Sequence, residues 1–278
     1  MDFAGTPMDT IITHMVGREI KEKFPRVECQ KGEKIFEVKN LNAGKLVRDI
    51  NFEVYAGEIV GFAGLMGAGR TELALSVFGN TPKYKLLEGE IYVEGKKVDF
   101  KTPRDATRAG LAYVSEDRKH NGLILIQDVK FNTTIANLDK LLEGVVVNEN
   151  EEIIQVTEYK KSLNIKTPSI KQLVGNLSGG NQQKVQIAKW LFAEPKVLIL
   201  DEPTRGIDVG AKFEIYTIIN RLVAEGYSVL MISSDLPEIL GMSDRIYVMA
   251  EGSITGELSA AEANEQNIMA MATKTEEA

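Results

Sequence analysis

The residues with the most recognisable chemistry lie in a glycine-rich stretch, "GFAGLMGAGRTELALSVFG", from position 61 to position 79. Gly64 and Gly69 have the spacing of the phosphate-binding pattern G-x-x-x-x-G-K-[ST], with Arg70 in the lysine position and Thr71 in the hydroxyl position. Glycines let backbone N–H groups turn inward around a phosphate, and a helix that begins behind them favours an anion. Thr71 would give an oxygen to Mg²⁺. The stretch therefore predicts a phosphate-binding loop that carries arginine instead of lysine.

Two further candidates follow an apolar run late in the chain. The segment "LILDEPT" places Asp201 and Glu202 at the carboxyl end of a predicted buried strand, where open parallel sheets hold their ligands. Asp201 can hold Mg²⁺ through water, and Glu202 can orient or deprotonate an attacking water. We expect these two acids to lie beside the glycine-rich loop.

A third motif, "LSGGNQQKV", runs from Leu177 to Val185 between the other two. Ser178, Gly179 and Gly180 would sit at the amino terminus of a helix. The dipole and free N–H groups of such a terminus favour an anion. This motif predicts a second anion-binding end that has no lysine of its own.

The elements that must position these motifs can be read from the hydrophobic pattern. From Ile35 onward, short alternating segments predict antiparallel strands around "EIVGFAG", which is uniformly apolar and suits a central strand. Residues 127–193 are mostly helical in pattern: "NTTIANLDKLLEG", "NENEEIIQVTEYKKSLN" and "GGNQQKVQIAKWLFAE". Then strand, helix, strand and helix alternate, which predicts a parallel sheet covered on both faces. A strand pair around Glu251 and Gly252 and a short helix end the chain.

Composition excludes several classes of protein. The 278 residues are 44% hydrophobic and 26% charged, as in an ordinary globular protein, and the net charge of -7 argues against non-specific nucleic-acid binding. The single cysteine, Cys29, allows no internal disulfide and favours a reducing compartment. We find no apolar run of about 18 residues and no secretory signal, so any membrane contact is expected through a partner.

The motifs together resemble a known family. "LSGGNQQ" resembles the signature of ATP-binding cassette (ABC) ATPases, and its place before "LILDEPT" is the order found in that family; the similarity covers roughly residues 35–260. With "GLMGAGRTEL", "SEDRK" and "SSDLPEILGMSDRI", the chain resembles the second, carboxy-terminal cassette of the double-cassette ATPase of bacterial monosaccharide importers (ribose, galactose and xylose type). The resemblance implies an α/β P-loop NTPase fold with a RecA-like core, an antiparallel β subdomain and a helical subdomain at about residues 127–185.

The resemblance also implies a domain organisation and partners. Residues 1–33, with an apolar stripe from Met8 to Val16, resemble a linker helix from a missing first cassette, and residues 34–278 a nucleotide-binding domain. The implied partners are the first cassette of the same or a sister chain, integral membrane permease subunits and, indirectly, a periplasmic or extracellular sugar-binding protein, with no nucleic acid. ATP and Mg²⁺ are the implied cofactors. The implied location is peripheral, on the cytoplasmic face of the cell membrane.

The resemblance also implies roles for individual residues, according to their positions in the motifs. Cassettes of this family pair head to tail, and each ATP lies between the P-loop of one and the signature of the other. The residues that resemble nucleotide-binding positions are Gly64, Leu65, Met66, Gly67, Ala68, Gly69, Arg70, Thr71, Glu72, Glu116, Asp201 and Ser234. Among these, Thr71 and Asp201 resemble the metal ligands, and Glu202 resembles the catalytic glutamate. The residues that resemble the signature and partner-site positions are Leu177, Ser178, Gly179, Gly180, Asn181, Gln182 and Asp208.

Three positions depart from the family pattern, all on the P-loop side. Arg70 replaces lysine, Glu116 replaces the usual glutamine that senses the γ-phosphate, and Ser234 replaces the usual switch histidine. We therefore expect this P-loop to bind nucleotide but hydrolyse it poorly, while the intact signature completes the partner's ATP site. Two alternatives remain open at this point: a non-hydrolysing regulatory or structural cassette, and a soluble cassette protein of translation or DNA repair.

Overall fold

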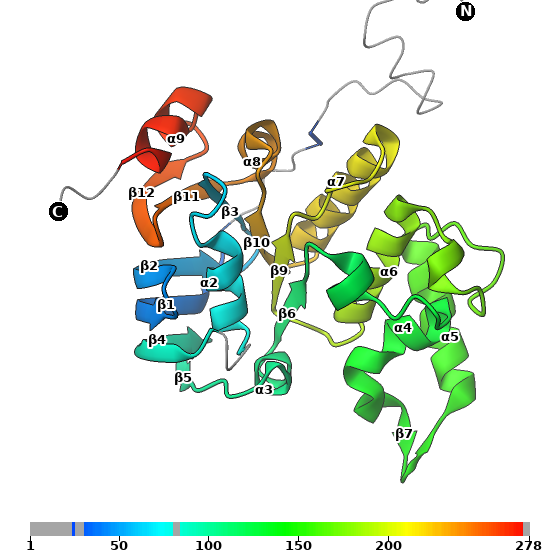
Figure 1. The fold of residues 1–278 in the computed structure, drawn as a ribbon. Helices are drawn as coiled ribbons and strands as arrows, with labels where there is room; N and C mark the ends of the chain where they lie inside the picture. The colour runs from blue at the N-terminus through cyan, green and yellow to red at the C-terminus, as the bar shows by residue number, and fades with distance from the viewer. Residues whose placement is uncertain (1–23, 26–30, 80–83, 275–278) are drawn as a thin grey trace, which may run out of the picture.

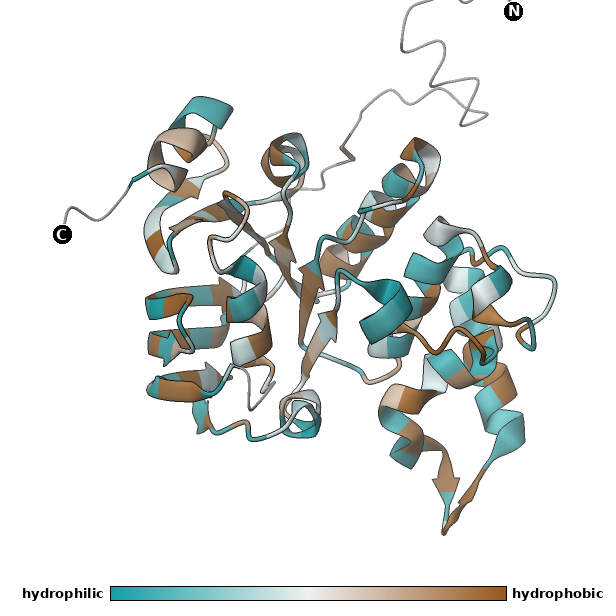
Figure 2. Cartoon of the chain, viewed as in Figure 1, coloured by the Kyte–Doolittle hydropathy of each residue, from teal (hydrophilic) through white to brown (hydrophobic). Residues whose placement is uncertain are grey.

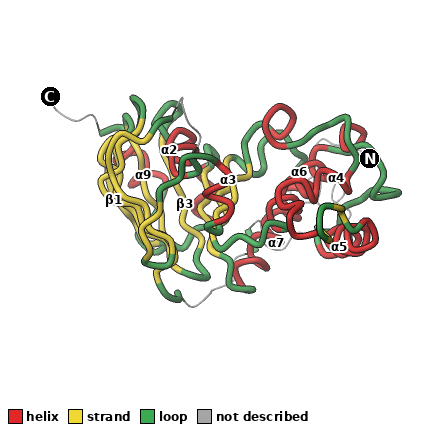
Figure 3. The backbone as a smooth tube through the Cα atoms, turned by 90° about the horizontal axis from the view of Figure 1, so that it is seen from below, coloured by secondary structure: helices red, strands yellow, loops and turns green. Residues whose placement is uncertain are grey.

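The computed structural model describes residues 24–25, 31–79 and 84–274. Within these ranges the chain forms a strand-rich lobe and a helical lobe, which lie side by side in two perpendicular views (Figures 1 and 3). No helix in the described ranges is both long enough and apolar enough to span a membrane. The predicted helix at the amino terminus lies outside the described residues. Phe24, which follows it, packs against Tyr216 with ring centroids 5.3 Å apart.

A six-stranded sheet forms the centre of the strand-rich lobe, in the order β12-β11-β3-β10-β9-β6. Its strands are β3 (Ile59–Gly64), β6 (Leu111–Val114), β9 (Val197–Asp201), β10 (Ser228–Ile232), β11 (Arg245–Ala250) and β12 (Ser253–Ser259). All neighbours are parallel except β12, which runs antiparallel to β11. Every residue of β9 and β10 is buried, which explains their nearly unbroken apolar sequences. The predicted parallel sheet is confirmed.

Alternate side chains of this sheet enter two separate cores, because successive residues of a strand point to opposite faces. Leu198 and Met231 belong to one core, and Ile199 and Leu230 to the other. The first core is completed by α6 (Gly179–Leu191), α7 (Val209–Ala224), α8 (Leu236–Met242) and α9 (Glu265–Ala272). The second is completed by α2 (Arg70–Val77), α3 (Pro103–Arg108) and a second sheet. Figure 2 shows the central strands in the brown of apolar residues.

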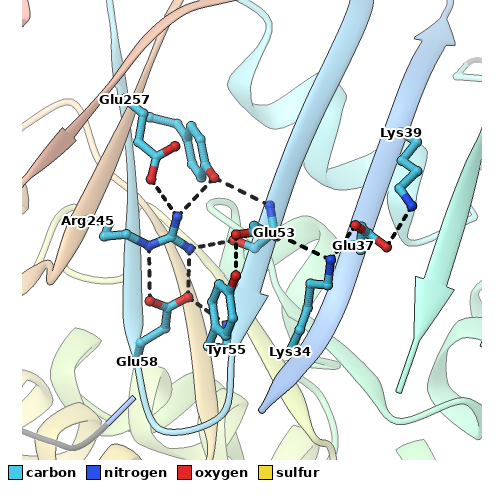
Figure 4. Close-up of polar contacts among 9 residues, drawn as sticks. Lys34, Glu37, Lys39, Glu53, Tyr55, Glu58, Arg245 and Glu257 are labelled. Atoms are coloured by element: carbon cyan, nitrogen blue, oxygen red, sulfur yellow. Dashed lines mark hydrogen bonds and ion pairs between the residues drawn. The ribbon is translucent and has the colours of Figure 1, made fainter. Parts of the chain in front are cut away.

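The second sheet is antiparallel, as predicted, in the order β2-β1-β4-β5. Its strands are β1 (Lys34–Ala43), β2 (Val47–Tyr55), β4 (Leu86–Val93) and β5 (Lys96–Val98). Arg245 of β11 connects the two sheets (Figure 4): its Nη2 donates to the carbonyl of Glu53 at 2.8 Å, and Nε and Nη2 donate to the Glu58 carboxylate at 3.1 and 2.8 Å. The Phe52 and Phe62 rings pack across the same junction with centroids 5.1 Å apart.

The helical lobe contains one departure from the sequence prediction. Its elements are η1 (Arg118–Gly122), α4 (Val129–Thr134), η2 (Ile135–Leu141), β7 (Leu142–Glu143), β8 (Val146–Val147), α5 (Glu149–Ser162) and η3 (Val174–Asn176), and they lead into α6. The helices expected at 148–164 and 179–194 are confirmed as α5 and α6. A single helix over 132–144 is wrong: the backbone of Asn137 is non-helical, and Gly144 at φ +68° turns the chain into the β7–β8 ribbon.

Candidate functional site

The glycine-rich loop, residues 64–71, joins the end of β3 to the start of α2. Gly67 and Gly69 have φ of +84° and +98°, which residues with a Cβ rarely adopt. A Cβ on Gly69 would lie 2.2 Å from the carbonyl oxygen of Leu46, so space also requires glycine there. No side chain caps the start of α2. The loop therefore presents the amino terminus of α2 in the form that binds an anion.

The side chain of Arg70 reaches the end of a neighbouring strand. Its side chain is only 8% exposed, and Nη1 donates a hydrogen bond of 2.5 Å to the carbonyl oxygen of Ser233, just beyond the end of β10. Burial lowers the pKa of Arg70, while the charges of Glu202 and Asp201 oppose that shift. Arginine remains protonated in this setting. The guanidinium is thus anchored to a neighbouring strand end and lies close to both acids.

Asp201 ends β9 and is completely buried. The hydroxyl of Tyr113 on β6 donates to its Oδ2 at 2.8 Å, and Oδ1 has no hydrogen-bond partner among the described residues. Burial raises the pKa of Asp201, and interactions with the hydroxyls of Tyr113 and Thr71 lower it. The structure therefore brings Thr71 and Asp201, the two predicted metal ligands, to the same place. Hydroxyl and carboxylate oxygens are suitable ligands for Mg²⁺.

Glu202 follows Asp201 with a left-handed backbone, φ +48°. Its N–H donates to the carbonyl of Ile232 at 2.9 Å, and the Ser234 hydroxyl donates to its Oε2 at 3.2 Å. Burial raises the pKa of Glu202, a favourable change for a general base. Serine in the position of the switch histidine thus contacts the candidate catalytic acid directly.

Glu116, the third departure, lies on the loop after β6, where it forms an ion pair with Arg205. This pairing offsets the negative charge that glutamate has in place of the usual glutamine. Arg205 follows the "DEPT" segment and its side chain is 65% exposed. The structure therefore connects Glu116 to the 205–208 turn.

The signature forms the start of α6. Ser178 is the residue before the helix; its hydroxyl does not cap the helix but accepts a hydrogen bond of 2.9 Å from Nδ2 of Asn181. Asn181 Oδ1 in turn accepts from the backbone N–H of Lys166 at 2.7 Å. Gln182 is buried and donates to the carbonyl of Val174 at 3.2 Å. Leu177 is partly buried against the larger core. The exposed Ser178 and the first turn of α6 thus present free N–H groups at the surface.

Asp208 lies at the start of α7 and accepts a hydrogen bond of 2.9 Å from the N–H of Ala211. A Cβ on Gly180 would lie 2.5 Å from the Cβ of Ala211, so α6 and α7 approach closely at this point. Asp208 and the signature are therefore neighbours.

The candidate residues fall into two groups. One lies around the glycine-rich loop and the ends of β9 and β10, and the other lies around the starts of α6 and α7.

Several residues that hydrogen-bond to these two groups were not among the candidates predicted from the sequence. Tyr113 holds Asp201, and Arg118 donates to the carbonyls of Arg205 and Gly206. Buried Glu238 accepts hydrogen bonds from Thr204 at 2.7 Å and from Ser233. Arg118 was visible in "SEDRK", but no pattern indicated which carbonyls it would reach. Tyr113 lies outside the quoted motifs, and Glu238 lies within "SSDLPEILGMSDRI", but the contacts of both depend on the pairing of strands distant in sequence.

The sequence is similar to a known family and to curated proteins. Residues 47–205 match the family described as ABC transporter. The chain is 55% identical over 270 residues to the xylose import ATP-binding protein XylG of Thermoanaerobacter pseudethanolicus, covering 95% of this chain and 53% of that protein. It is 54% identical over 274 residues to the L-arabinose transport ATP-binding protein AraG of Geobacillus stearothermophilus, covering 96% and 53%. The chain thus spans about half the length of these curated relatives.

Solved structures show the same fold. A nucleotide-free ATP-binding cassette from an ABC transporter superposes with a TM-score of 0.72 at 23% identity, covering 85% of this chain and 95% of that one. A dimeric cassette in a post-hydrolysis state, bound to ADP and Pi, superposes with a TM-score of 0.69 at 21% identity, covering 81% and 99%. The predicted ABC ATPase fold is confirmed. By its sequence match over more than half its length, this chain belongs to the ABC transporter family.

Proposed function

We propose that this chain is an ATP-binding domain of a monosaccharide importer, and that it supplies the signature half of a shared ATP site more effectively than the P-loop half. The observation that carries the proposal is the position of Arg70, whose guanidinium is buried and already bonded to the Ser233 carbonyl. The names of the relatives, which are xylose, arabinose and ribose transport ATP-binding proteins, support the substrate class.

Nucleotide binding on the P-loop side is supported by residues that lie close together. The left-handed Gly67 and Gly69 shape the loop. Thr71 and the unpartnered Oδ1 of Asp201 would hold Mg²⁺, which neutralises phosphate charge when bound. Arg70, although bonded to Ser233, keeps a unit positive charge close to Asp201 and Glu202, and this charge favours an anion at the site. Binding is therefore retained.

Hydrolysis of nucleotide at this P-loop, unlike binding, is expected to be impaired. The guanidinium is a bulky planar fork, whereas lysine offers a compact charge. Ser234 cannot relay a proton as histidine can, and loss of such a group typically costs a factor of about 10² to 10⁴ in rate. Glu202 remains in place to orient water. We infer slow hydrolysis at the site seated on this loop.

The signature side has every residue type that the family pattern requires. Ser178, Gly179 and Gly180 begin α6, and Asp208 lies beside them at the start of α7. A partner cassette with a lysine-containing P-loop would receive this surface over its own nucleotide. We infer that the remaining partners are integral membrane permease subunits and, indirectly, a sugar-binding protein, and that the chain works peripherally on the cytoplasmic face of the membrane.

The test combines binding and turnover. We expect the isolated chain to bind Mg-ATP in a calorimetric titration yet to hydrolyse it at least about 10²-fold more slowly than the assembled importer. Absence of ATP binding would contradict the proposal. A second candidate is a cassette that only regulates its partner; the anchoring of Arg70 favours it for the P-loop side. It would be preferred if loss of the signature left the ATPase rate of the assembled importer unchanged.

A further inference from the structure

Arg118 connects three segments that are far apart in the sequence. It begins η1, directly after the loop that carries Glu116. Its Nη1 donates to the carbonyl oxygen of Arg205 at 2.8 Å, and its Nη2 donates to the carbonyl oxygen of Gly206 at 3.1 Å. The rigid fork of a guanidinium presents two N–H groups at a fixed spacing that suits two neighbouring acceptors, whereas a lysine ammonium is a single point donor on a flexible chain. Arg118 therefore fixes the turn that ends at Asp208.

The same guanidinium lies against the signature. A Cβ on Gly179 would be 2.9 Å from Nη2 of Arg118 and 3.3 Å from the carbonyl oxygen of Gly206. A Cβ on Gly206 would be 3.6 Å from the same nitrogen. The absence of a Cβ at Gly179 leaves room for the arginine between the start of α6 and the 205–208 turn, while a Cβ on Gly206 would make only an ordinary contact. Packing within this chain therefore favours glycine at position 179, independently of any contact with a nucleotide.

A second interaction, in addition to the bonds of Arg118, connects the loop after β6 to the 205–208 turn. Glu116 forms an ion pair with the side chain of Arg205, while Arg118 binds the carbonyl of that residue. The exposed ion pair contributes little on its own, because solvent screens it. Arg118 is half-buried and makes two hydrogen bonds to backbone carbonyls, whereas the side chain of Arg205 is 65% exposed. Arg118 is therefore the stronger of the two connections.

We propose that Arg118 is a positioning residue that holds the signature and the 205–208 turn as one unit, so that Ser178, Gly179 and Asp208 reach a partner's nucleotide together. The inference rests on the proposed function, because it assumes that this surface completes a partner's site. Without Arg118, the carbonyls of Arg205 and Gly206 lose their donors. The turn then moves independently of α6, and the partner's nucleotide meets a surface that is correctly oriented for only part of the time.

The experiment uses Arg118→Ala, the conservative Arg118→Lys and a matched control, Arg221→Ala. Arg221 also donates through Nη1 to a backbone carbonyl, that of Ser162 at 2.7 Å, but it lies at the other end of α7. Amide hydrogen exchange of the chain should accelerate at least about tenfold, both at residues 178–182 and at 205–211, in Arg118→Ala. Arg118→Lys should be intermediate, because an ammonium reaches one carbonyl well, and Arg221→Ala should not affect either segment. Unchanged exchange, or acceleration in one segment alone, would overturn the inference.

Kinetics of the assembled importer separate this inference from the proposed function. Arg118→Ala should lower the kcat of ATP hydrolysis about tenfold with little change in the KM for ATP, since nucleotide is bound mainly by the partner's P-loop. Ser178→Arg is measured alongside. If Ser178→Arg abolishes activity while Arg118→Ala leaves kcat unchanged, the inference is wrong and the proposed function stands. If neither variant changes kcat, the proposed function is wrong, and the inference, which rests on it, is overturned as well.

Discussion

Nη1 of Arg70 lies 2.5 Å from the backbone carbonyl oxygen of Ser233, so the residue in the lysine position of the phosphate loop is anchored to a neighbouring strand end. Ser233 is itself held by buried Glu238, which also accepts a hydrogen bond from Thr204. The arginine is thus built into a network that joins β10 to the segment after Asp201. This relationship is the structural basis for treating the two halves of the candidate ATP site differently.

The first prediction concerns the loop itself. Arg70→Lys should raise the affinity of the isolated chain for Mg-ATP about tenfold, or about 1.4 kcal/mol, because a compact ammonium can enter the loop. Titration with a fluorescent ATP analogue measures this change, with Arg70→Gln as the control that removes the charge. An affinity of Arg70→Lys equal to that of the unchanged chain would count against the role given to the arginine.

A second prediction concerns the contact between the signature helix and α7. Gly180→Ala places a Cβ 2.5 Å from the Cβ of Ala211, and one helix must move. Such overpacking costs about 1–3 kcal/mol of unfolding free energy. Adding Ala211→Gly should recover most of the loss, because it removes the opposing methyl group. Urea unfolding measures both variants, and failure of the double variant to recover would show that the clash is not the cause.

A third prediction concerns the junction between the two sheets. Glu58 is only 3% exposed and pairs with Arg245, so Arg245→Met leaves a buried carboxylate without its partner. We expect a loss of about 3–5 kcal/mol in unfolding free energy, which Glu58→Gln in the same chain should partly restore. Arg104→Met is the control: its ion pair with Asp139 is exposed and is worth about 0–1 kcal/mol. Strictly additive losses for the Arg245 and Glu58 variants would contradict the coupling.

A fourth prediction follows from a partly buried lysine, Lys189, on the signature helix. Burial lowers the pKa of Lys189 to about 8, below the value of about 10.4 for an unfolded chain. Between these values the unfolded chain binds more protons than the folded one, so stability rises with pH across this interval. Lys189→Met should therefore be more stable relative to the unchanged chain at pH 7 than at pH 10.

The matched control for that prediction is Lys171→Met, since Lys171 is exposed. The stability of Lys189→Met relative to the unchanged chain should change by about 1.4 kcal/mol for each pH unit between the two pKa values. The hydrogen bond lost to the carbonyl of Gly122 costs about 1 kcal/mol and lowers the stability of the variant equally at both pH values. Urea unfolding at both pH values measures it. A stability difference that does not depend on pH would show that Lys189 titrates normally.

Much of the fold could be predicted because its signals are local. The alternation of β1 and β2, the apolar runs of β9 and β10 and the helical periods of α5 and α6 each lie within a short window of sequence. The β7–β8 ribbon was missed because Leu142 and Val146 suit a helix or a strand equally well over so few residues. There the turn at Gly144 decides the outcome.

The sequence indicated which residues to place in the candidate site but not how their side chains would contact one another. Motif spacing assigned Thr71 and Asp201 to one site, and the structure brings them close together because both follow strands of one parallel sheet. It did not indicate that Glu116 would pair with Arg205 or that Arg70 would bind Ser233. Those contacts depend on the direction of long side chains, which spacing does not determine.

The fifth prediction tests the central claim, and its measurement is the ATPase rate of the assembled importer with a substitution on each side. Ser178→Arg places a bulky charge at the exposed start of α6 and should lower the rate by about 10²-fold or more, as loss of a transition-state contact does. Arg70→Ala should lower it by less than about fivefold if, as we propose, this P-loop contributes little turnover. Equal losses from the two substitutions would contradict the account.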